Sequence, residues 1–297
     1  MIRRCCCDLK RALGVHFGRS WSYVRRSLVP LWVFGLAFAA SAETVGFERP
    51  AEETLIDQHI FSAKACGPTA ALTVLKVAHP DVFQQLPGAN DETRLRYVTD
   101  RYFRKPSSND PKRPRYTNIS GVSHEDMANV MREMAEEHDL PAIRSGELVR
   151  GADESSREMV FRVHRILRSS LNAKTPPIIA LRSQVAVYDE AAEKWGWERM
   201  ADHFVIVLTV PDRLDEGELG FAFDYIDPNG GLMATGFIYA ERKHAFAGFQ
   251  GSEDNGQWLG GNRFLVVAAP RSYSLIDEDQ AEWQVRAVTI LSYFVGS

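Results

Sequence analysis

The chain has 297 residues, of which 45% are hydrophobic and 25% are charged, and its formal net charge at pH 7 is −4. These proportions are typical of ordinary globular proteins and exclude a long disordered chain. The length allows one large domain or two of modest size.

The first 42 residues have the composition of an export signal. They contain seven Lys and Arg residues but a single acid, and they end in the apolar run LVPLWVFGLAFAA (28–40) followed by the small residues ASA before Glu43. This order of basic region, short apolar region and small-residue cleavage site predicts a signal peptide that is removed after Ala42. The apolar run is too short to span a bilayer comfortably, so we expect no stable membrane insertion once the signal is removed.

The export route has two interpretations. The sequence RRSLV at residues 25–29 fits a loose twin-arginine pattern, which directs bacterial proteins that are exported already folded. Ordinary export from a later start codon explains the same residues equally well. Both interpretations predict a periplasmic or extracellular bacterial protein, and both remove Cys5, Cys6 and Cys7 with the signal.

Removal of the signal leaves an acidic chain with one cysteine. It then has 28 Lys and Arg against 38 Asp and Glu, a net charge near −10, with no basic stripe. Such a chain is a poor candidate for binding nucleic acid or an anionic membrane, and we expect neither as a partner. The remaining cysteine, Cys66, cannot form an intrachain disulfide. Because exported proteins usually pair their cysteines or lack them, its retention favours a chemical role.

The first half of the remaining chain is predicted to be helical. Pro68 suits the first turn of a helix that begins at Cys66 and ends before Pro80, with apolar residues at helical spacing. A polar, proline-rich loop is expected at 105–118. Further helices are expected over 91–104, 121–141 and 153–171, and Ser123 has the side chain of an N-cap for the second of these.

The second half is predicted to be a sheet. After Pro176 and Pro177 the β-type runs are residues 178–188, 203–210, 219–227 and 263–270, and the tail 277–295 is expected to be a packing helix. Helices followed by strands indicate an α+β fold with an antiparallel sheet. We expect a single domain over 43–297, with its core at about 55–270.

Cys66 lies where a thiol can become a nucleophile. Backbone N–H groups at a helix start favour a thiolate. A thiolate also needs a base and a group that orients the base. Among the histidines, His203 opens the most apolar strand, whereas His124, His138 and His164 are expected on the surfaces of amphipathic helices. Asp227 ends the next strand, although an Asp before Pro is also a common turn residue.

The segments ACGPTAALTVL, DHFVIVLTV and DYIDPNGG, in this order, resemble the papain-like cysteine peptidases of the bacteriocin-processing (double-glycine) peptidase-like group. The resemblance covers roughly residues 55–240. It implies a papain-like fold and a peptide or other amide substrate. It also implies Cys66 as the nucleophile, His203 as the general base and acid, and Asp227 as the carboxylate that orients His203.

One position departs from the family pattern. The family places an oxyanion-hole glutamine about six residues before the cysteine, where this chain has Ile60, and Gln58 could serve only if the loop is longer. Loss of that donor would cost on the order of 3 kcal/mol in transition-state stabilisation. This leaves open a non-catalytic peptide-binding member of the fold. A second alternative is a γ-glutamyl transpeptidase similar to phytochelatin synthase, because such proteins share the same fold logic and also use a Cys-His-Asp set. Metal-binding and nucleotide-binding motifs are absent from the sequence, so we expect no cofactor.

Overall fold

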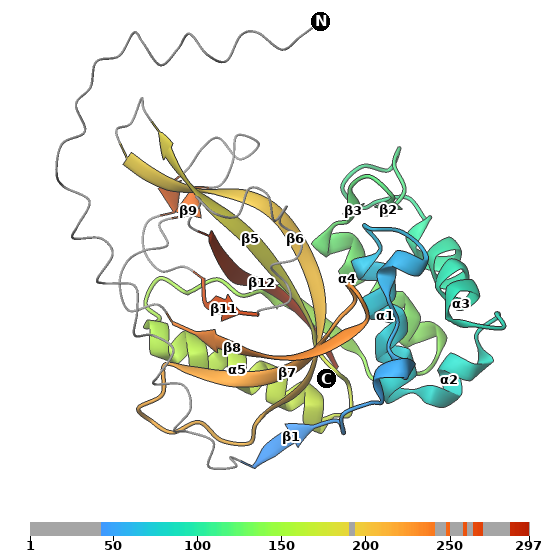
Figure 1. The fold of residues 1–297 in the computed structure, drawn as a ribbon, viewed down its shortest axis with the longest axis horizontal. Coiled ribbons are helices and arrows are strands. Elements are labelled where there is room, and N and C mark those ends of the chain that lie inside the picture. Colours follow the sequence, from blue (N-terminus) through green and yellow to red (C-terminus); the bar gives the residue numbers. More distant parts are fainter. Residues whose placement is uncertain are drawn as a thin grey trace, which may run out of the picture. The chain divides into compact units, whose positions relative to one another are not determined.

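The computed structural model describes residues 43–189, 194–240, 248–249, 258–259, 264–269 and 286–296. The chain from Glu43 onward forms one compact unit. The predicted signal peptide, residues 1–42, lies outside the described residues. The described part combines helices with a large antiparallel sheet (Figure 1), which is the mixed α and β composition expected from the sequence.

Five α-helices occupy the first half of the described chain, together with three short helical turns. The α-helix predicted to begin at Cys66 does begin there, and the helix and π-helical turn from Asp91 to Phe103 cover the second predicted helix. The Ser123 side chain caps the next long helix by accepting from the Asp126 N–H, as predicted. The elements are α1 Cys66–Ala78, α2 Pro80–Gln85, α3 Asp91–Val98, α4 His124–Glu137, α5 Ser156–Asn172, η3 Glu52–Thr54, η4 Gln58–Ile60 and η5 Thr99–Phe103.

The strands are most numerous in the second half. They are β1 Thr44–Gly46, β2 Tyr116–Thr117, β3 Gly121–Val122, β4 Ile143–Glu147, β5 Ile178–Asp189, β6 Lys194–Pro211, β7 Gly220–Asp227, β8 Leu232–Tyr239, β9 Gly248–Phe249, β10 Trp258–Leu259, β11 Val266–Ala268 and β12 Arg286–Gly296. The main sheet has eight strands in the order β1-β6-β5-β12-β11-β8-β7, with β4 paired to β12. Because β7 also pairs with β6, six of these strands form a closed ring of pairings.

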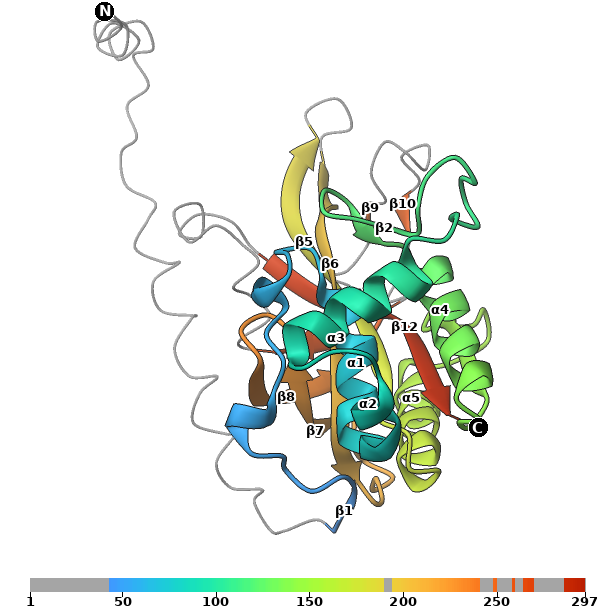
Figure 2. The ribbon, with the colours of Figure 1, turned by 90° about the vertical axis from the view of Figure 1, so that its right-hand side faces the viewer.

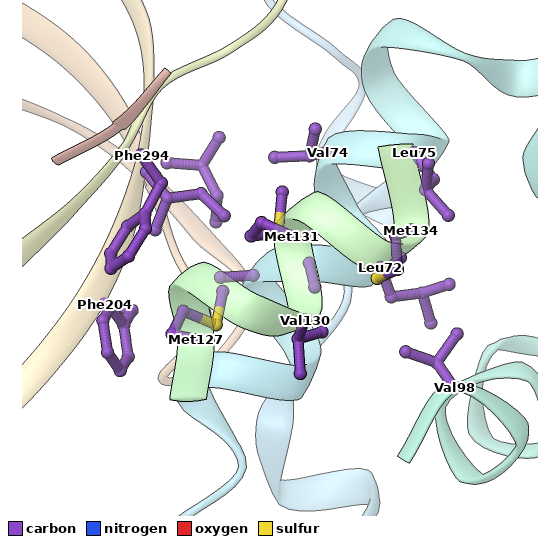
Figure 3. Close-up of a cluster of buried hydrophobic side chains, with 14 of the residues drawn as sticks. Leu72, Val74, Leu75, Val98, Met127, Val130, Met131, Met134, Phe204 and Phe294 are labelled. Atoms are coloured by element: carbon purple, nitrogen blue, oxygen red, sulfur yellow. The ribbon is translucent and has the colours of Figure 1, made fainter. Parts of the chain in front are cut away.

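Residues 178–181 of β5 and 203–208 of β6 are buried on both faces of the sheet, which explains why these parts of the strands are almost continuously apolar. Ile178 of β5 and Ile206 of β6 belong to a core shared with α1, α3 and α4, whereas their neighbours Ile179 and Val205 belong to a core shared with α5. Figure 3 shows the first core, where Met127 and Met131 of α4 lie between Leu72 of α1 and the rings of Phe204 and Phe294, and Met134 lies beside Leu72. Figure 2 shows α1 behind α3, and α1 also contacts β6.

Two sequence predictions are wrong. The tail was expected to be a helix, but its described part forms β12, which pairs with β5, β4 and β11. Pairing partners on both sides override the weak helical pattern of this segment. His164 was expected at the surface of α5, but it is buried, with Nε2 2.7 Å from the Pro211 carbonyl oxygen and its ring edge-on to Phe221. Among the described residues, no helix is both long and apolar enough to cross a membrane.

Candidate active site

Cys66 is the first residue of α1 and is partly exposed to solvent. No side chain caps this helix, so the backbone N–H groups of its first turn remain directed at the region around the thiol. The backbone N–H groups of Gly67, in the same turn, and of Phe204, in β6, interact with the sulfur. The packing of α1 on β6 thus brings helix and strand donors to one thiol.

His203 and Asp227 lie on the adjacent strands β6 and β7, whose pairing brings the end of β7 beside the middle of β6. Their Nε2 and Oδ1 atoms are 2.6 Å apart, and both side chains are almost completely buried. Asp227 Oδ1 also accepts the Asn229 backbone N–H at 2.8 Å. Because Asp227 engages Nε2, the other ring nitrogen, Nδ1, is left for the hydrogen bond between His203 and Cys66.

The three groups shift one another's protonation toward an ion pair. Burial opposes ionisation of the Cys66 thiol, but its hydrogen bond to His203 and the charge of that ring hold its pKa below the ordinary value. Burial likewise lowers the pKa of His203, whereas the charge and hydrogen bond of Asp227, with a further contribution from Cys66, raise it to about 10. The arrangement therefore favours a thiolate beside an imidazolium at neutral pH.

Gln58 is fully buried between the loop before Cys66 and the turn after Asp227. Its side-chain Nε2 donates to the Ala63 carbonyl oxygen at 2.7 Å, and its backbone N–H donates to the Pro228 carbonyl oxygen at 2.8 Å. An amide nitrogen has two hydrogens, so one remains for another acceptor. The Ile60 side chain, six residues before Cys66, is 41% exposed.

The turn that follows Asp227 is fastened to the segment that contains Gln58. Asp57 Oδ1 accepts the Gly230 N–H at 3.1 Å, and His59 Nε2 lies 2.7 Å from Asn229 Oδ1. Gly231 has φ +56°, and a Cβ there would lie 3.0 Å from the Asp57 nitrogen. The two glycines of the turn thus allow close contact with the segment before the cysteine.

A short hairpin of β2 and β3 packs against the N-terminal end of α1. A Cβ on Gly67 would lie 2.3 Å from Val122 Cγ1, and a Cβ on Gly121 would lie 3.4 Å from the Lys64 carbonyl oxygen. This contact could not be predicted from the sequence, because residues 105–118 have the composition of an irregular loop. Tyr116 of β2 is consequently a site neighbour that the sequence did not suggest.

A second charged cluster adjoins His203. The Arg182 guanidinium donates to both carboxylate oxygens of Asp202, at 2.9 and 3.1 Å. His124, the first residue of α4, has its Nε2 3.5 Å from Asp202 Oδ2. This cluster fastens the start of α4 to the strand residue that precedes His203, and it makes the partly exposed His124 a link between helix and sheet.

Among the residues that the structure describes, no group of three or more His, Cys, Asp and Glu side chains could hold a metal ion. The models of known protein families include none that matches this chain, and the curated proteins include no match to it either.

Proposed function

We propose that this protein is a papain-like cysteine hydrolase that cleaves a peptide or another amide bond. The observation that carries the proposal is the connected set Cys66, His203 and Asp227, with the thiol at a helix start and the His–Asp pair buried at 2.6 Å. The cysteine on a helix that packs against an antiparallel sheet, with histidine and aspartate on adjacent strands, supports the papain-like assignment.

In the proposed acylation step, the Cys66 thiolate attacks the substrate carbonyl carbon. A C–S bond forms, and the electron pair of the carbonyl π bond moves to the oxygen. The Cys66 backbone N–H and the second amide hydrogen of Gln58 are the donors proposed for this oxyanion. As the carbonyl re-forms, the C–N bond breaks and the His203 imidazolium gives its proton to the departing nitrogen.

Deacylation uses the same residues in the opposite direction. Neutral His203 accepts a proton from water, whose oxygen attacks the thioester carbonyl, and the C–S bond then breaks to release the acid and restore the Cys66 thiolate. Asp227 holds the ring orientation and stabilises its positive charge throughout. We also propose export from a bacterial cell, on the basis of the sequence of residues 1–42.

A non-catalytic peptide-binding protein is the second candidate, because one hydrogen of the Gln58 amide is committed to Ala63. A γ-glutamyl transpeptidase would share the acylation step but would require a thiol peptide as substrate. Such a requirement separates the transpeptidase from a hydrolase, since a hydrolase transfers the acyl group to water.

The test is the pH dependence of iodoacetamide labelling at Cys66, read by peptide mass spectrometry in the full chain. For a thiolate–imidazolium pair we expect labelling to stay fast below about pH 6 and to slow sharply in His203→Ala. His138→Ala is the matched control. It also removes a histidine, but one that belongs to a different set of contacts, at the C-terminal end of α4 beside Tyr102. Labelling that rises only near about pH 8.5 and ignores His203 would overturn the enzyme proposal and leave the binding protein.

A further inference from the structure

The β2–β3 hairpin does more than pack against α1, because it brings an aromatic side chain to the residues that lead into Cys66. Tyr116 of β2 pairs in register with Val122, the residue that contacts Gly67. The rings of Tyr116 and Phe61 have centroids 6.3 Å apart. The hairpin therefore contacts the segment from Phe61 to Gly67 near both of its ends.

The Tyr116 hydroxyl is buried, and its own hydrogen has no acceptor within the described structure. Only 5% of the residue is exposed, and the Ser62 side chain approaches its oxygen as a hydrogen-bond donor, which lowers the pKa of the hydroxyl. Cys66 lies close enough for the charge of the thiolate to act on the hydroxyl. A buried hydroxyl whose hydrogen has no acceptor is unfavourable, so its place beside a nucleophile points to an acceptor that arrives from outside.

We propose that the Tyr116 hydroxyl donates a hydrogen bond to the substrate's carbonyl oxygen when Cys66 attacks it. This inference rests on the proposed function. As the C–S bond forms, the carbonyl π electrons move to the oxygen, and the hydroxyl donates a hydrogen bond to that oxygen while keeping its own proton. When the carbonyl re-forms and the leaving nitrogen takes its proton from His203, Tyr116 is unchanged.

The environment of Tyr116 suits a neutral donor. Burial raises the pKa of its hydroxyl above the ordinary value, and the charge of Cys66 raises it further, although Ser62 acts in the opposite direction. The group therefore keeps its proton beside a thiolate at neutral pH. It would also supplement Gln58, which has one amide hydrogen already committed to Ala63.

Two probes separate oxyanion stabilisation from nucleophilicity. Iodoacetamide alkylates the thiolate by displacement at a saturated carbon and forms no oxyanion, whereas p-nitrophenyl acetate acylates it through one. In Tyr116→Phe we expect alkylation of Cys66 to stay within about twofold of wild type, while the burst of p-nitrophenolate slows by about tenfold or more. The full chain is used, and the burst of Cys66→Ala is subtracted to remove the contribution of other nucleophiles.

Tyr102→Phe is the matched control, because it removes another buried tyrosine hydroxyl, one that contacts His138. It should leave both rates near wild type. Equal slowing of both probes in Tyr116→Phe, or slowing of neither, would overturn the inference while leaving the proposed function intact. If wild-type Cys66 shows no fast labelling at mildly acidic pH, the proposed function fails and the inference fails with it.

Discussion

The backbone N–H of Gln58 donates a hydrogen bond to the carbonyl oxygen of Pro228, 2.8 Å away. Pro228 directly follows Asp227, so this bond joins the segment before the cysteine to the turn that follows the carboxylate partner of His203. Asp57 strengthens the same connection by accepting the Gly230 N–H, and it also accepts the N–H of His59 within its own segment. The position of Gln58 thus depends on the turn at the end of β7.

Replacement of Asp57 should loosen this connection. We expect Asp57→Ala to lower the free energy of unfolding by about 1–2 kcal/mol, because it removes the acceptor of two backbone N–H groups. Asp57→Asn keeps one acceptor oxygen and should lose less. Urea unfolding measures both, and Thr54→Ala, in the preceding exposed turn, is the control.

The same variant has a kinetic signature. If the connection positions Gln58, Asp57→Ala should slow the p-nitrophenyl acetate burst more than it slows iodoacetamide labelling. Equal rates for variant and wild type with both probes would show that the connection does not position a donor.

Asp227→Asn should change the pH profile of Cys66 rather than its accessibility. Asparagine keeps the shape of the side chain but removes the charge that raises the pKa of His203. The imidazolium then loses its proton at lower pH, and the pKa of the thiol should move up toward its ordinary value. We expect the inflection of iodoacetamide labelling to rise by about one pH unit or more.

The control for that measurement is Asp224→Asn, on the same strand. Asp224 accepts hydrogen bonds from the hydroxyls of Thr209 and Thr235, and it therefore belongs to a different network. Its profile should overlay that of wild type. An unchanged profile in Asp227→Asn would contradict the role assigned to the carboxylate.

The local features of the site were predictable from the sequence because short-range chemistry decides them. A proline in the first turn and apolar residues at helical spacing define α1, and the apolar run after His203 defines the buried part of β6. The polar segment from Lys194 to Asp202 was not assigned to a strand, yet it extends β6 by pairing with β5. That extension depends on a partner strand, which a local pattern does not reveal.

The conformation of the loop before Cys66 could not be predicted from the spacing between Gln58 and the cysteine. The N–H groups of Phe61 and Ser62 both bond to the Gln58 carbonyl oxygen, and the Ala65 N–H bonds to that of Ser62. Two tight turns therefore take up residues within this loop, and Gln58, two residues farther from Cys66 than Ile60, is the buried side chain. Tyr116 was missed for a related reason, since only the tertiary contact of the hairpin brings it near Cys66.

The raised pKa of His203 should appear in the pH dependence of stability. Below about pH 6.5 the histidine is protonated in both the folded and the unfolded chain, and the stabilisation by Asp227 is fully present. As the pH rises toward 10, the unfolded chain binds fewer protons than the folded one, so this contribution is progressively lost. The pKa of Cys66 is lowered in the folded chain, so its contribution to the free energy of unfolding rises with pH. Cys66 must therefore be replaced before the contribution of His203 can be measured alone.

The comparison is therefore between Cys66→Ala and Cys66→Ala with His203→Gln. Between about pH 7 and pH 9 we expect the free energy of unfolding of the first to fall with a slope of up to about 1.4 kcal/mol per pH unit more than that of the second. Urea unfolding at a series of pH values measures the difference. Parallel curves would mean that His203 titrates alike in the folded and unfolded chains.

Gly67 and Val122 provide a steric test of how closely the hairpin approaches the cysteine. A Cβ on Gly67 would lie 2.3 Å from Val122 Cγ1, so Gly67→Ala should lower the free energy of unfolding by about 1–3 kcal/mol, although alanine is the better helix former. The next atoms, Met127 Sδ at 3.6 Å and Phe204 Cδ2 at 3.7 Å, are at ordinary contact distance.

Val122→Ala removes the methyl group that the new Cβ would meet, so the double variant should be more stable than the sum of the two single effects predicts. Strict additivity in urea unfolding would mean that the hairpin lies farther from Cys66, and the proposed role of Tyr116 would lose its structural basis.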